Sequence, residues 1–256
     1  MINLSSFIRF HAQATPNRIA LTYDGDDISY RELFERIGKF AAYLQALGIR
    51  PGDVVAVLMK NSPAFLEIAF AVSHLGAVFL PINFRLHAEE VDYICGNSDA
   101  RLLIADSDFA NRQTQLQTIF CDDALQRSTR SLTEKYLPTA MQALEPQDLF
   151  RLMYTSGTTG HPKGVMHSYD NFYWKSYEHS IVLNLNATTR LLIAGPLYHV
   201  GAFDLPGIAV LQHGGTLAIV RDFDAAAVLA LIEQQKLDSA WLAPVMTRLI
   251  LDCETR

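Results

Sequence analysis

The sequence predicts an α/β fold with two related lobes of mainly parallel sheet flanked by helices. Two apolar runs, Asp53–Met59 and Ala77–Ile82, are typical of buried strands, and a helix that begins near Pro63 lies between them. This order is typical of a parallel strand–helix–strand unit. A strand, a proline-containing loop, a helix, a glycine and a strand follow one another again from Arg190 to Val220. The second occurrence indicates either a related lobe or the general likeness of such units, and both explanations carry equal weight.

The first predicted lobe covers residues 1–145. In order, we expect a helix at Ser5–Ala14, a hairpin of Ile19–Tyr23 and Ile28–Tyr30, a helix from Ser29 to Gly48, the strand–helix–strand unit, a helix at about Ala88–Asn97 and a strand at Arg101–Ala105. Ser29 and Glu32 have the spacing of a capping box, and Gly48 suits a left-handed helix end. Residues 106–145 show no clear period, so we interpret them as a variable surface crossing between the lobes.

The second predicted lobe covers residues 146–256. It begins with the strand Asp148–Met153, which leads into a glycine-rich loop. After the loop we expect a strand at Gly164–His167, a helix from Ser168 to about Leu183, a strand at Arg190–Ala194, a helix to about Gln212, a strand at Thr216–Val220, a helix from Asp224 to about Gln235 and a strand at Ser239–Ala243.

The composition indicates an ordinary globular protein of 256 residues with a net charge of −6. No block of lysine and arginine occurs, which argues against a nucleic-acid partner. The three cysteines, Cys95, Cys121 and Cys253, lack metal-binding spacing and suit free thiols in a reducing compartment. The longest apolar stretch, Ile68–Ile82, is too short to span a bilayer, and the amino terminus is not of the secretory type. We therefore predict a cytoplasmic protein without a membrane span.

The glycine-rich loop is the most informative stretch of the sequence. Residues Tyr154–Val165 read YTSGTTGHPKGV and combine three glycines, four hydroxyl side chains and one lysine. Glycines let backbone N–H groups converge on an anion, hydroxyls add donors, and a lysine supplies a compact cation. The loop lacks the Gly-Lys-Ser/Thr ending of a P-loop and the spacing of a dinucleotide GxGxxG. The pattern predicts a phosphate-binding loop, although most loops of this composition are plain surface connections.

Residue for residue, this stretch resembles the signature loop of the AMP-forming, adenylate-forming enzymes, a family of acyl-CoA synthetases, aryl-CoA ligases, firefly luciferase and peptide-synthetase adenylation domains. The resemblance implies that a carboxylic acid and ATP give an acyl-adenylate and pyrophosphate, with Mg²⁺ on the phosphates, and that coenzyme A then displaces AMP. It assigns the phosphate contacts to Thr155, Ser156, Gly157, Thr158, Thr159, Gly160 and Lys163. Lys163 and Thr158 would be the catalytic residues, with the Thr158 hydroxyl near the metal.

Two further segments resemble the parts of this family that line the acid-binding channel. The segment Pro196–Ala202, PLYHVGA, contains His199 and Gly201, and the segment AWLAP contains Trp241 and Ala243. Without the resemblance, His199 would more often be a satisfied core histidine, and Trp241 is at least as often ordinary core. The PLYH form and the Thr158-Thr159 pair favour coenzyme A ligases over amino-acid adenylation domains, but neither decides between them.

The resemblance covers only the front part of the family's plan. We find no downstream aromatic-Gly-x-Thr-Glu or Thr-Gly-Asp segment and no carboxy-terminal domain with its lysine. We therefore expect an amino-terminal fragment of an acyl- or aryl-CoA ligase that is inactive alone, with exposed apolar surface that would support a homo-oligomer. The alternatives are a non-catalytic remnant or interaction module, and an amino-acid adenylation domain that loads a carrier-protein thiol.

Overall fold

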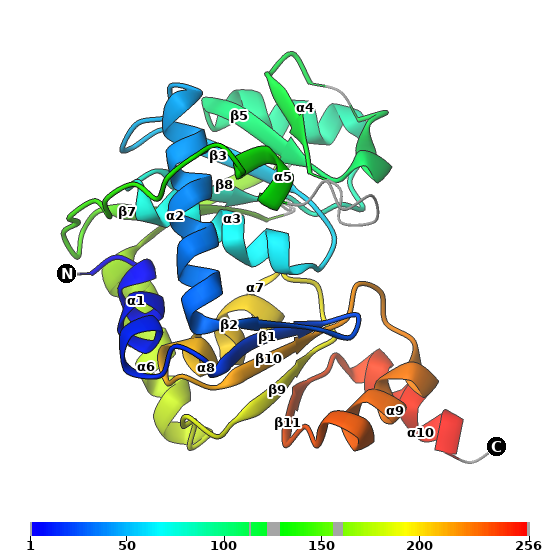
Figure 1. Cartoon of the computed structure of the whole chain (residues 1–256). Coiled ribbons are helices and arrows are strands. Elements are labelled where there is room, and N and C mark those ends of the chain that lie inside the picture. Colours follow the sequence, from blue (N-terminus) through cyan, green and yellow to red (C-terminus); the bar gives the residue numbers. More distant parts are fainter. Residues whose placement is uncertain (1, 113, 122–128, 156–160, 255–256) are drawn as a thin grey trace. The chain divides into compact units, whose positions relative to one another are not determined.

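The computed structural model describes residues 2–112, 114–121, 129–155 and 161–254. They form two compact units that alternate along the chain (Figure 1). Unit 1 contains Met1–Ser6, Phe34–Met59 and Ala64–Tyr173, and unit 2 contains Phe7–Leu33, Lys60–Pro63 and Trp174–Arg256. The helices α1 (Ser5–Ala14), α2 (Tyr30–Ala46) and α6 (Tyr169–Val182) each continue from one unit into the other along the sequence. The division of the chain into domains at residue 145 stays a prediction.

Unit 1 contains a six-stranded sheet in the order β6-β5-β3-β4-β7-β8. Its strands are β3 (Val54–Leu58), β4 (Val78–Pro81), β5 (Ala100–Ala105), β6 (Thr118–Phe120), β7 (Leu149–Thr155) and β8 (Lys163–Ser168). All neighbouring pairs are parallel except β7 and β8, which are antiparallel. The parallel strand–helix–strand unit β3–α3–β4, with α3 at Pro63–His74, is therefore confirmed.

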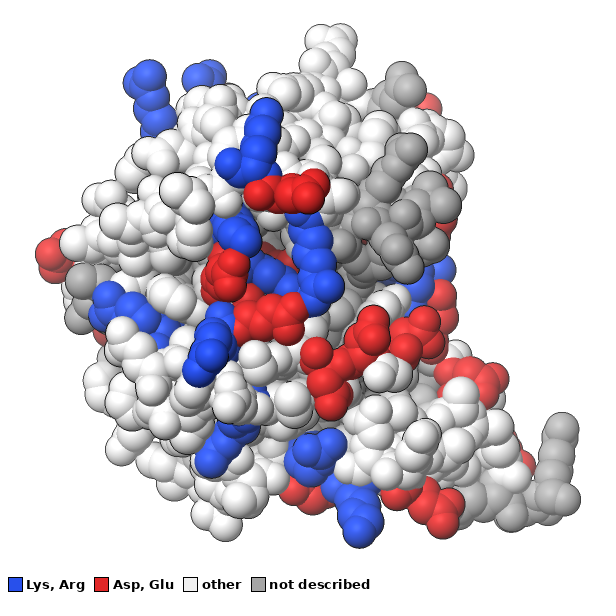
Figure 2. Space-filling model, viewed as in Figure 1, with Lys and Arg blue, Asp and Glu red and all other residues white. Residues whose placement is uncertain are grey.

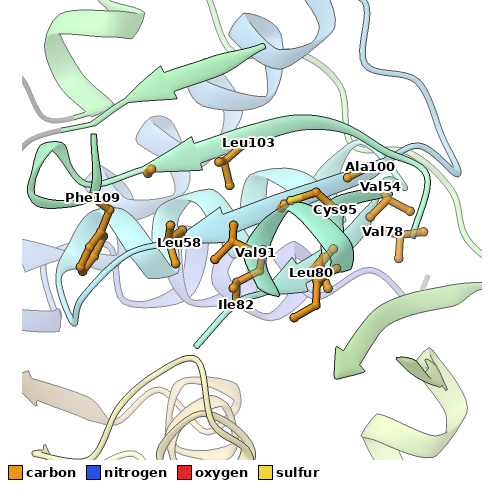
Figure 3. Close-up of a cluster of buried hydrophobic side chains, with 13 residues drawn as sticks. Val54, Leu58, Val78, Leu80, Ile82, Val91, Cys95, Ala100, Leu103 and Phe109 are labelled. Atoms are coloured by element: carbon orange, nitrogen blue, oxygen red, sulfur yellow. The ribbon is translucent and has the colours of Figure 1, made fainter. Parts of the chain in front are cut away.

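A cluster of apolar side chains fills the space between this sheet and helix α4 (Ala88–Asn97). Val91 and Cys95 extend from α4 among side chains of β3, β4 and β5, such as Leu58 and Leu80 (Figure 3). The side chains of Val91 and Cys95 are almost completely buried, so α4 is fixed on the sheet by the hydrophobic effect. Burial also raises the pKa of the Cys95 thiol to about 12, which keeps this thiol protonated and unreactive.

The segment that lacked a sequence period contributes little regular structure. Its described elements are the 3₁₀ turn η1 (Ser107–Phe109), strand β6 and the short helix α5 (Thr129–Thr133). Thr129 donates its hydroxyl hydrogen to the buried carboxylate of Glu67 on α3, and Arg36 on α2 forms an ion pair with the same carboxylate at 2.8 Å. This network joins α5 to α2 and α3, so the segment is tied to unit 1 by specific polar contacts.

Unit 2 contains a five-stranded sheet in the order β11-β9-β10-β1-β2. Its strands are β1 (Ile19–Tyr23), β2 (Asp26–Ser29), β9 (Arg190–Ile193), β10 (Thr216–Ile219) and β11 (Ser239–Trp241). The predicted hairpin of β1 and β2 is confirmed as the antiparallel pair, and the other neighbours are parallel. Strand β1 pairs with β10, almost 200 residues later in the chain, with Leu21 opposite Leu217, and Figure 1 shows dark blue β1 beside orange β10.

The helices of unit 2 confirm the predicted order with one refinement. Its later helices are α7 (Val200–Ala202), α8 (Ile208–Gln212), α9 (Ala225–Gln235) and α10 (Pro244–Glu254), and a π-helical turn, η2 (Phe203–Gly207), joins α7 to α8. Pro206 lies in η2 and lacks a backbone N–H, which explains why one continuous α-helix does not run to Gln212. Asp224 caps α9 as expected, because its Oδ1 accepts a hydrogen bond from the Ala227 N–H at 2.8 Å.

The face shown in Figure 2 carries interspersed charges of both signs. On the face shown in Figure 2, lysine and arginine atoms lie among aspartate and glutamate atoms and uncharged surface. A mixed face of this kind would steer neither polyanions nor polycations strongly. Among the described helices, none has the combination of length and apolar character needed to cross a bilayer.

Candidate active site

The strands β7 and β8 form the stem of the predicted phosphate loop. Their antiparallel register pairs Tyr154 with Gly164 and Thr155 with Lys163, so Thr155 and Lys163 are opposite each other where the stem ends. Both side chains are exposed. A hydroxyl and an ammonium group at facing positions offer two kinds of donor to one anion. Five predicted contact residues, Ser156, Gly157, Thr158, Thr159 and Gly160, lie outside the described residues, and their roles stay predictions.

The Tyr154 side chain holds the two strands of the stem to helix α4. A Cβ atom on Gly164 would lie 2.9 Å from Tyr154 Cε2, so only a glycine at this position lets the tyrosine ring pass close over β8. The Tyr154 hydroxyl donates a hydrogen bond of 2.7 Å to the Asn97 Oδ1 on α4. Burial raises the pKa of Tyr154, so the phenol keeps the proton that it donates.

The carboxy-terminal side of the loop contacts α4 as well. The imidazole of His161 stacks on the Tyr93 ring, with ring centroids 4.7 Å apart and planes inclined by 21°. The Tyr93 hydroxyl donates a long hydrogen bond of 3.5 Å to the Pro162 carbonyl. The sequence analysis assigned no chemistry to His161, and in the structure this residue packs against Tyr93.

A buried arginine stabilises the base of the same stem. Arg151 on β7 is 1% exposed, and its guanidinium lies 5.6 Å from the ring centroids of both Phe150 and Phe172. Its Nε and Nη2 donate to the Nδ1 of His167 on β8 at 3.1 and 3.0 Å. Nδ1 must therefore be unprotonated, and the neutral imidazole carries its proton on Nε2. The contact joins β7 and β8 well before the loop.

The predicted acid-binding residues lie in unit 2. His199 caps α7, and its Nδ1 accepts a hydrogen bond of 3.1 Å from the Gly201 N–H. The imidazole is exposed and makes an edge contact with Tyr198 at a centroid distance of 6.5 Å. Because Nδ1 is used as an acceptor, the neutral ring presents an N–H at Nε2. His199 therefore has a local structural role together with an exposed donor.

Trp241, at the end of β11, lies directly against two glycines. A Cβ atom on Gly195 would lie 2.5 Å from Trp241 Cζ3, and one on Gly201 would lie 2.5 Å from Cη2 and closer still to Cζ2. The indole thus occupies the space that side chains at these two positions would fill. Gly201 lies against the Trp241 indole and donates its N–H to His199, and the predicted role of these residues in acid binding stays a prediction. Ala243 follows β11, and its carbonyl accepts from the Thr247 N–H at 3.1 Å at the start of α10.

Asn61 is a structural residue of this region that the sequence analysis missed. Its side chain is 3% exposed and makes hydrogen bonds with three backbone groups. Its Nδ2 donates to the carbonyls of Gly195 at 2.8 Å and Val220 at 3.2 Å, and its Oδ1 accepts from the Leu197 N–H at 2.7 Å. Asn61 therefore links the ends of β9 and β10. Its place just after an apolar strand was the one available signal.

Among the described residues, no group of three or more histidine, cysteine, aspartate or glutamate side chains could hold a metal ion. The magnesium site predicted at the Thr158 hydroxyl lies outside the described residues and stays a prediction. When bound, such an ion spreads the negative charge of the phosphates.

Comparison with known proteins decides the family. A family model described as "AMP-binding enzyme" matches residues 8–256. The chain belongs to this family. The predicted relationship to adenylate-forming enzymes is thereby confirmed, and it covers both units.

Relatives of this AMP-binding enzyme chain include coenzyme A ligases. This chain is 34% identical over 241 residues to a feruloyl-CoA synthase from Amycolatopsis sp, a match covering 93% of this chain and 48% of that protein. It is 33% identical over 232 residues to a 2-succinylbenzoate–CoA ligase from Geobacillus sp. (strain WCH70), covering 90% of this chain and 46% of that protein. The chain spans about half the length of these relatives.

Solved structures confirm the fold class. The N-terminal domain of FACL13 from Mycobacterium tuberculosis, solved with an inhibitor, superimposes with a TM-score of 0.89 at 28% identity. This match covers 98% of this chain and 65% of that one. O-succinylbenzoate coenzyme A synthetase from Bacillus subtilis, solved with AMP, gives a TM-score of 0.87 at 28% identity and covers 98% of this chain and 64% of that one.

Proposed function

We infer that the chain is the phosphate-binding part of an ATP-dependent acyl- or aryl-CoA ligase. In the proposed reaction a carboxylate oxygen attacks the α-phosphorus of ATP, pyrophosphate leaves, and the sulfur of coenzyme A then displaces AMP from the acyl-adenylate. The inference is supported chiefly by the match of the AMP-binding family to residues 8–256 together with a loop stem that pairs Thr155 with Lys163.

Lys163 and Thr155 would act by position and charge. The Lys163 ammonium would bind the β- and γ-phosphates of ATP, and the Thr155 hydroxyl would donate to the same group from the opposite strand. These contacts stabilise the negative charge that accumulates on the leaving pyrophosphate. No covalent intermediate with the protein is needed, so the chain requires no nucleophile at this site.

Aromatic acids are the favoured substrates within the proposed class. The relatives include a feruloyl-CoA synthase, a 2-succinylbenzoate–CoA ligase and an indoleacetate–CoA ligase. In this chain, Trp241 and the exposed Nε2 side of His199 would contact the acid. The indole offers a flat apolar surface and the imidazole a hydrogen-bond donor, a combination that suits an aromatic acid.

The remaining parts of the proposal concern surroundings and partners. Mg²⁺ would accompany ATP, and the reaction would take place in the cytoplasm. Trp174, Tyr177 and Ile181 on α6 are each more than 60% exposed, and this apolar surface would favour association with another polypeptide, including a second copy.

Acid-dependent exchange of labelled pyrophosphate into ATP tests the proposed function. The assay would use this chain alone and this chain joined to the carboxy-terminal half of the Amycolatopsis feruloyl-CoA synthase, with aryl, fatty and amino acids supplied separately. We expect no exchange by the chain alone and exchange with aryl or fatty acids by the joined protein. Exchange with amino acids alone would indicate an adenylation domain for a carrier protein. A joined protein that folds and binds ATP but shows no exchange with any acid would contradict the proposal.

Substitution of Lys163 tests the proposed phosphate contact through ATP binding, and substitution of Lys175 is the matched control. Loss of a hydrogen bond to a charged group costs about 1.5–3 kcal/mol, so Lys163→Ala should weaken ATP binding about ten- to hundred-fold. Lys175→Ala removes another exposed lysine, on α6, and should leave ATP binding unchanged. Equal effects of the two substitutions would mean that only overall charge matters.

A further inference from the structure

Two residues of α4, Tyr93 and Asn97, lie one helical turn apart on the same side of the helix. Both contact the glycine-rich loop or its stem. Tyr93 contacts His161 and Pro162 at the carboxy-terminal side of the loop, and Asn97 contacts Tyr154 of β7. The neighbouring residues Val91, Ile94 and Cys95 anchor the helix in the core. Tyr93, which also packs against the edge of this core cluster, and Asn97 therefore hold the loop and its stem to α4.

We propose that Tyr93 and Asn97 are positioning residues for phosphate binding: they hold the stem so that Lys163 is placed before the ligand arrives. This role rests on the proposed function. Lys163 is separated from His161 by a single residue, and that residue is a proline, whose fixed φ angle leaves the backbone little freedom. Fixing the His161 ring therefore restricts where the Lys163 backbone can lie.

The second contact restricts Lys163 from the other side. Gly164 follows Lys163 directly and lies under the Tyr154 ring, whose hydroxyl donates to Asn97. Lys163 is thus bracketed by His161, which stacks on Tyr93, and by Gly164, which is covered by a ring bonded to Asn97. Its exposed side chain stays available to a ligand. Ordering a binding residue in advance raises affinity, because less conformational entropy is lost on binding.

A matched control has to separate positioning from core packing. His161 and Asn97 are exposed, whereas Tyr93 is partly buried and also packs against the core cluster. Loss of the Tyr93 ring should therefore lower the stability of unit 1 as well as increase the freedom of the stem. Tyr136 is a suitable control, because it is also a partly buried tyrosine of unit 1 with an aromatic partner, Tyr43, at a centroid distance of 5.5 Å.

The test measures binding of inorganic tripolyphosphate, and of ATP, to the 256-residue chain and its variants by titration calorimetry. Tyr93→Leu should weaken tripolyphosphate binding about two- to ten-fold, the range expected for loss of one aromatic pair. Tyr93→Phe keeps the stacked ring and should bind almost as tightly as the unsubstituted chain. Tyr136→Leu should leave affinity unchanged while lowering the unfolding midpoint at least as much as Tyr93→Leu.

Two further readouts test whether Tyr93 acts through the stem. In a His161→Leu background, Tyr93→Leu should have little additional effect on affinity, because the stack is already lost. Amide hydrogen exchange of Lys163 and Gly164 should be faster in Tyr93→Leu than in Tyr136→Leu. Additive effects on affinity, or unchanged exchange, would overturn the positioning role.

The outcomes distinguish this proposal from the proposed function. If the unsubstituted chain binds tripolyphosphate and Tyr93→Leu binds it equally well, the positioning role is wrong and the proposed function stands. If the unsubstituted chain and every variant fail to bind tripolyphosphate and ATP, the phosphate site itself is wrong, and both proposals fail.

Discussion

Replacement of Gly201 by alanine tests the packing of the predicted acid-binding region. Gly201 does not have a positive φ angle, so alanine would not strain the backbone. Its Cβ atom would, however, lie 2.5 Å from Trp241 Cη2 and 2.7 Å from Cε2. Carbon atoms pack at about 3.5–4.0 Å, so the indole or α7 would have to move by roughly 1 Å or more. Overpacking of this kind costs about 1–3 kcal/mol, and we expect the free energy of unfolding to fall by that amount.

The chain offers a direct optical assay for this change. It contains two tryptophans, and Trp174 is 67% exposed on α6. In a Trp174→Phe background, the remaining fluorescence reports on Trp241 alone. Gly201→Ala should alter this emission and lower the urea midpoint of unfolding. Gly96→Ala is the control, because a Cβ atom at this position would meet no other atom within 4 Å. Gly96 also lies within helix α4, where alanine is more stable than glycine by up to about 1 kcal/mol.

The reasoning requires that the two residues interact. Combining Gly201→Ala with Trp241→Leu removes the ring that the new methyl group would strike. The double variant should therefore lose less stability than the sum of the single effects, by about 0.5–3 kcal/mol. Additive effects, or an unchanged Trp241 emission in Gly201→Ala, would refute the packing argument.

Three other predictions follow from the polar groups. Asn61→Ala should lower the free energy of unfolding by about 2–4 kcal/mol, because the carbonyls of Gly195 and Val220 and the Leu197 N–H each lose a hydrogen-bond partner. Denaturant unfolding measures this, and a loss below about 0.5 kcal/mol would contradict it. The thiol of Cys95 titrates near its ordinary pKa of 9.0 when unfolded and near 12 when folded, so stability should fall between these pH values by up to about 1.4 kcal/mol per pH unit. Cys95→Ala should reduce that slope, and an unchanged slope would count against it. Burial, with a smaller effect of His11, lowers the pKa of His213. On acidification the imidazole of the unfolded chain therefore gains a proton before that of the folded chain, and the free energy of unfolding should decrease as the pH falls below about 6.5. A His213→Asn variant with the same acid dependence would refute this.

The sequence predicted the local structure well where short-range chemistry decides it. Continuous apolar runs gave β3 and β4, and Asp224 gave the start of α9. Gly48 has a φ of 89°, as its predicted role at a helix end requires. These features depend on a few neighbouring residues, so the sequence contains the information directly.

The sequence analysis did not predict which distant β-strands pair with each other. Nothing local indicates that β1 pairs with β10 or that β8 turns back antiparallel to β7. Such pairings are set by the burial of whole faces and by loop closure, which residue patterns do not report. The π-helical turn that interrupts the helix after His199 was not predicted either, although Pro206, which lies in this turn, was visible in the sequence.

The sequence suggested candidate site residues but not the side chains that contact and position them. The loop pattern predicted Lys163 as a phosphate ligand and the PLYH segment predicted His199 as an acid-binding residue, and both roles stay predictions. The side chains that hold these residues were missed, because Tyr93, Asn97 and Asn61 come from elements distant in the sequence. A tyrosine or asparagine on a helix or after a strand has many ordinary roles, and only the fold shows which backbone it contacts.

The most direct test of the central claim, that the loop carried by Thr155 and Lys163 binds the terminal phosphates of ATP, is ³¹P NMR of ATP titrated with the chain. The account predicts that the β and γ resonances shift or broaden with the unsubstituted chain and with Lys175→Ala. It predicts much weaker changes with Lys163→Ala and little change when AMP replaces ATP. Phosphate resonances that remain unchanged, or that respond equally to the chain with and without Lys163, would contradict the account.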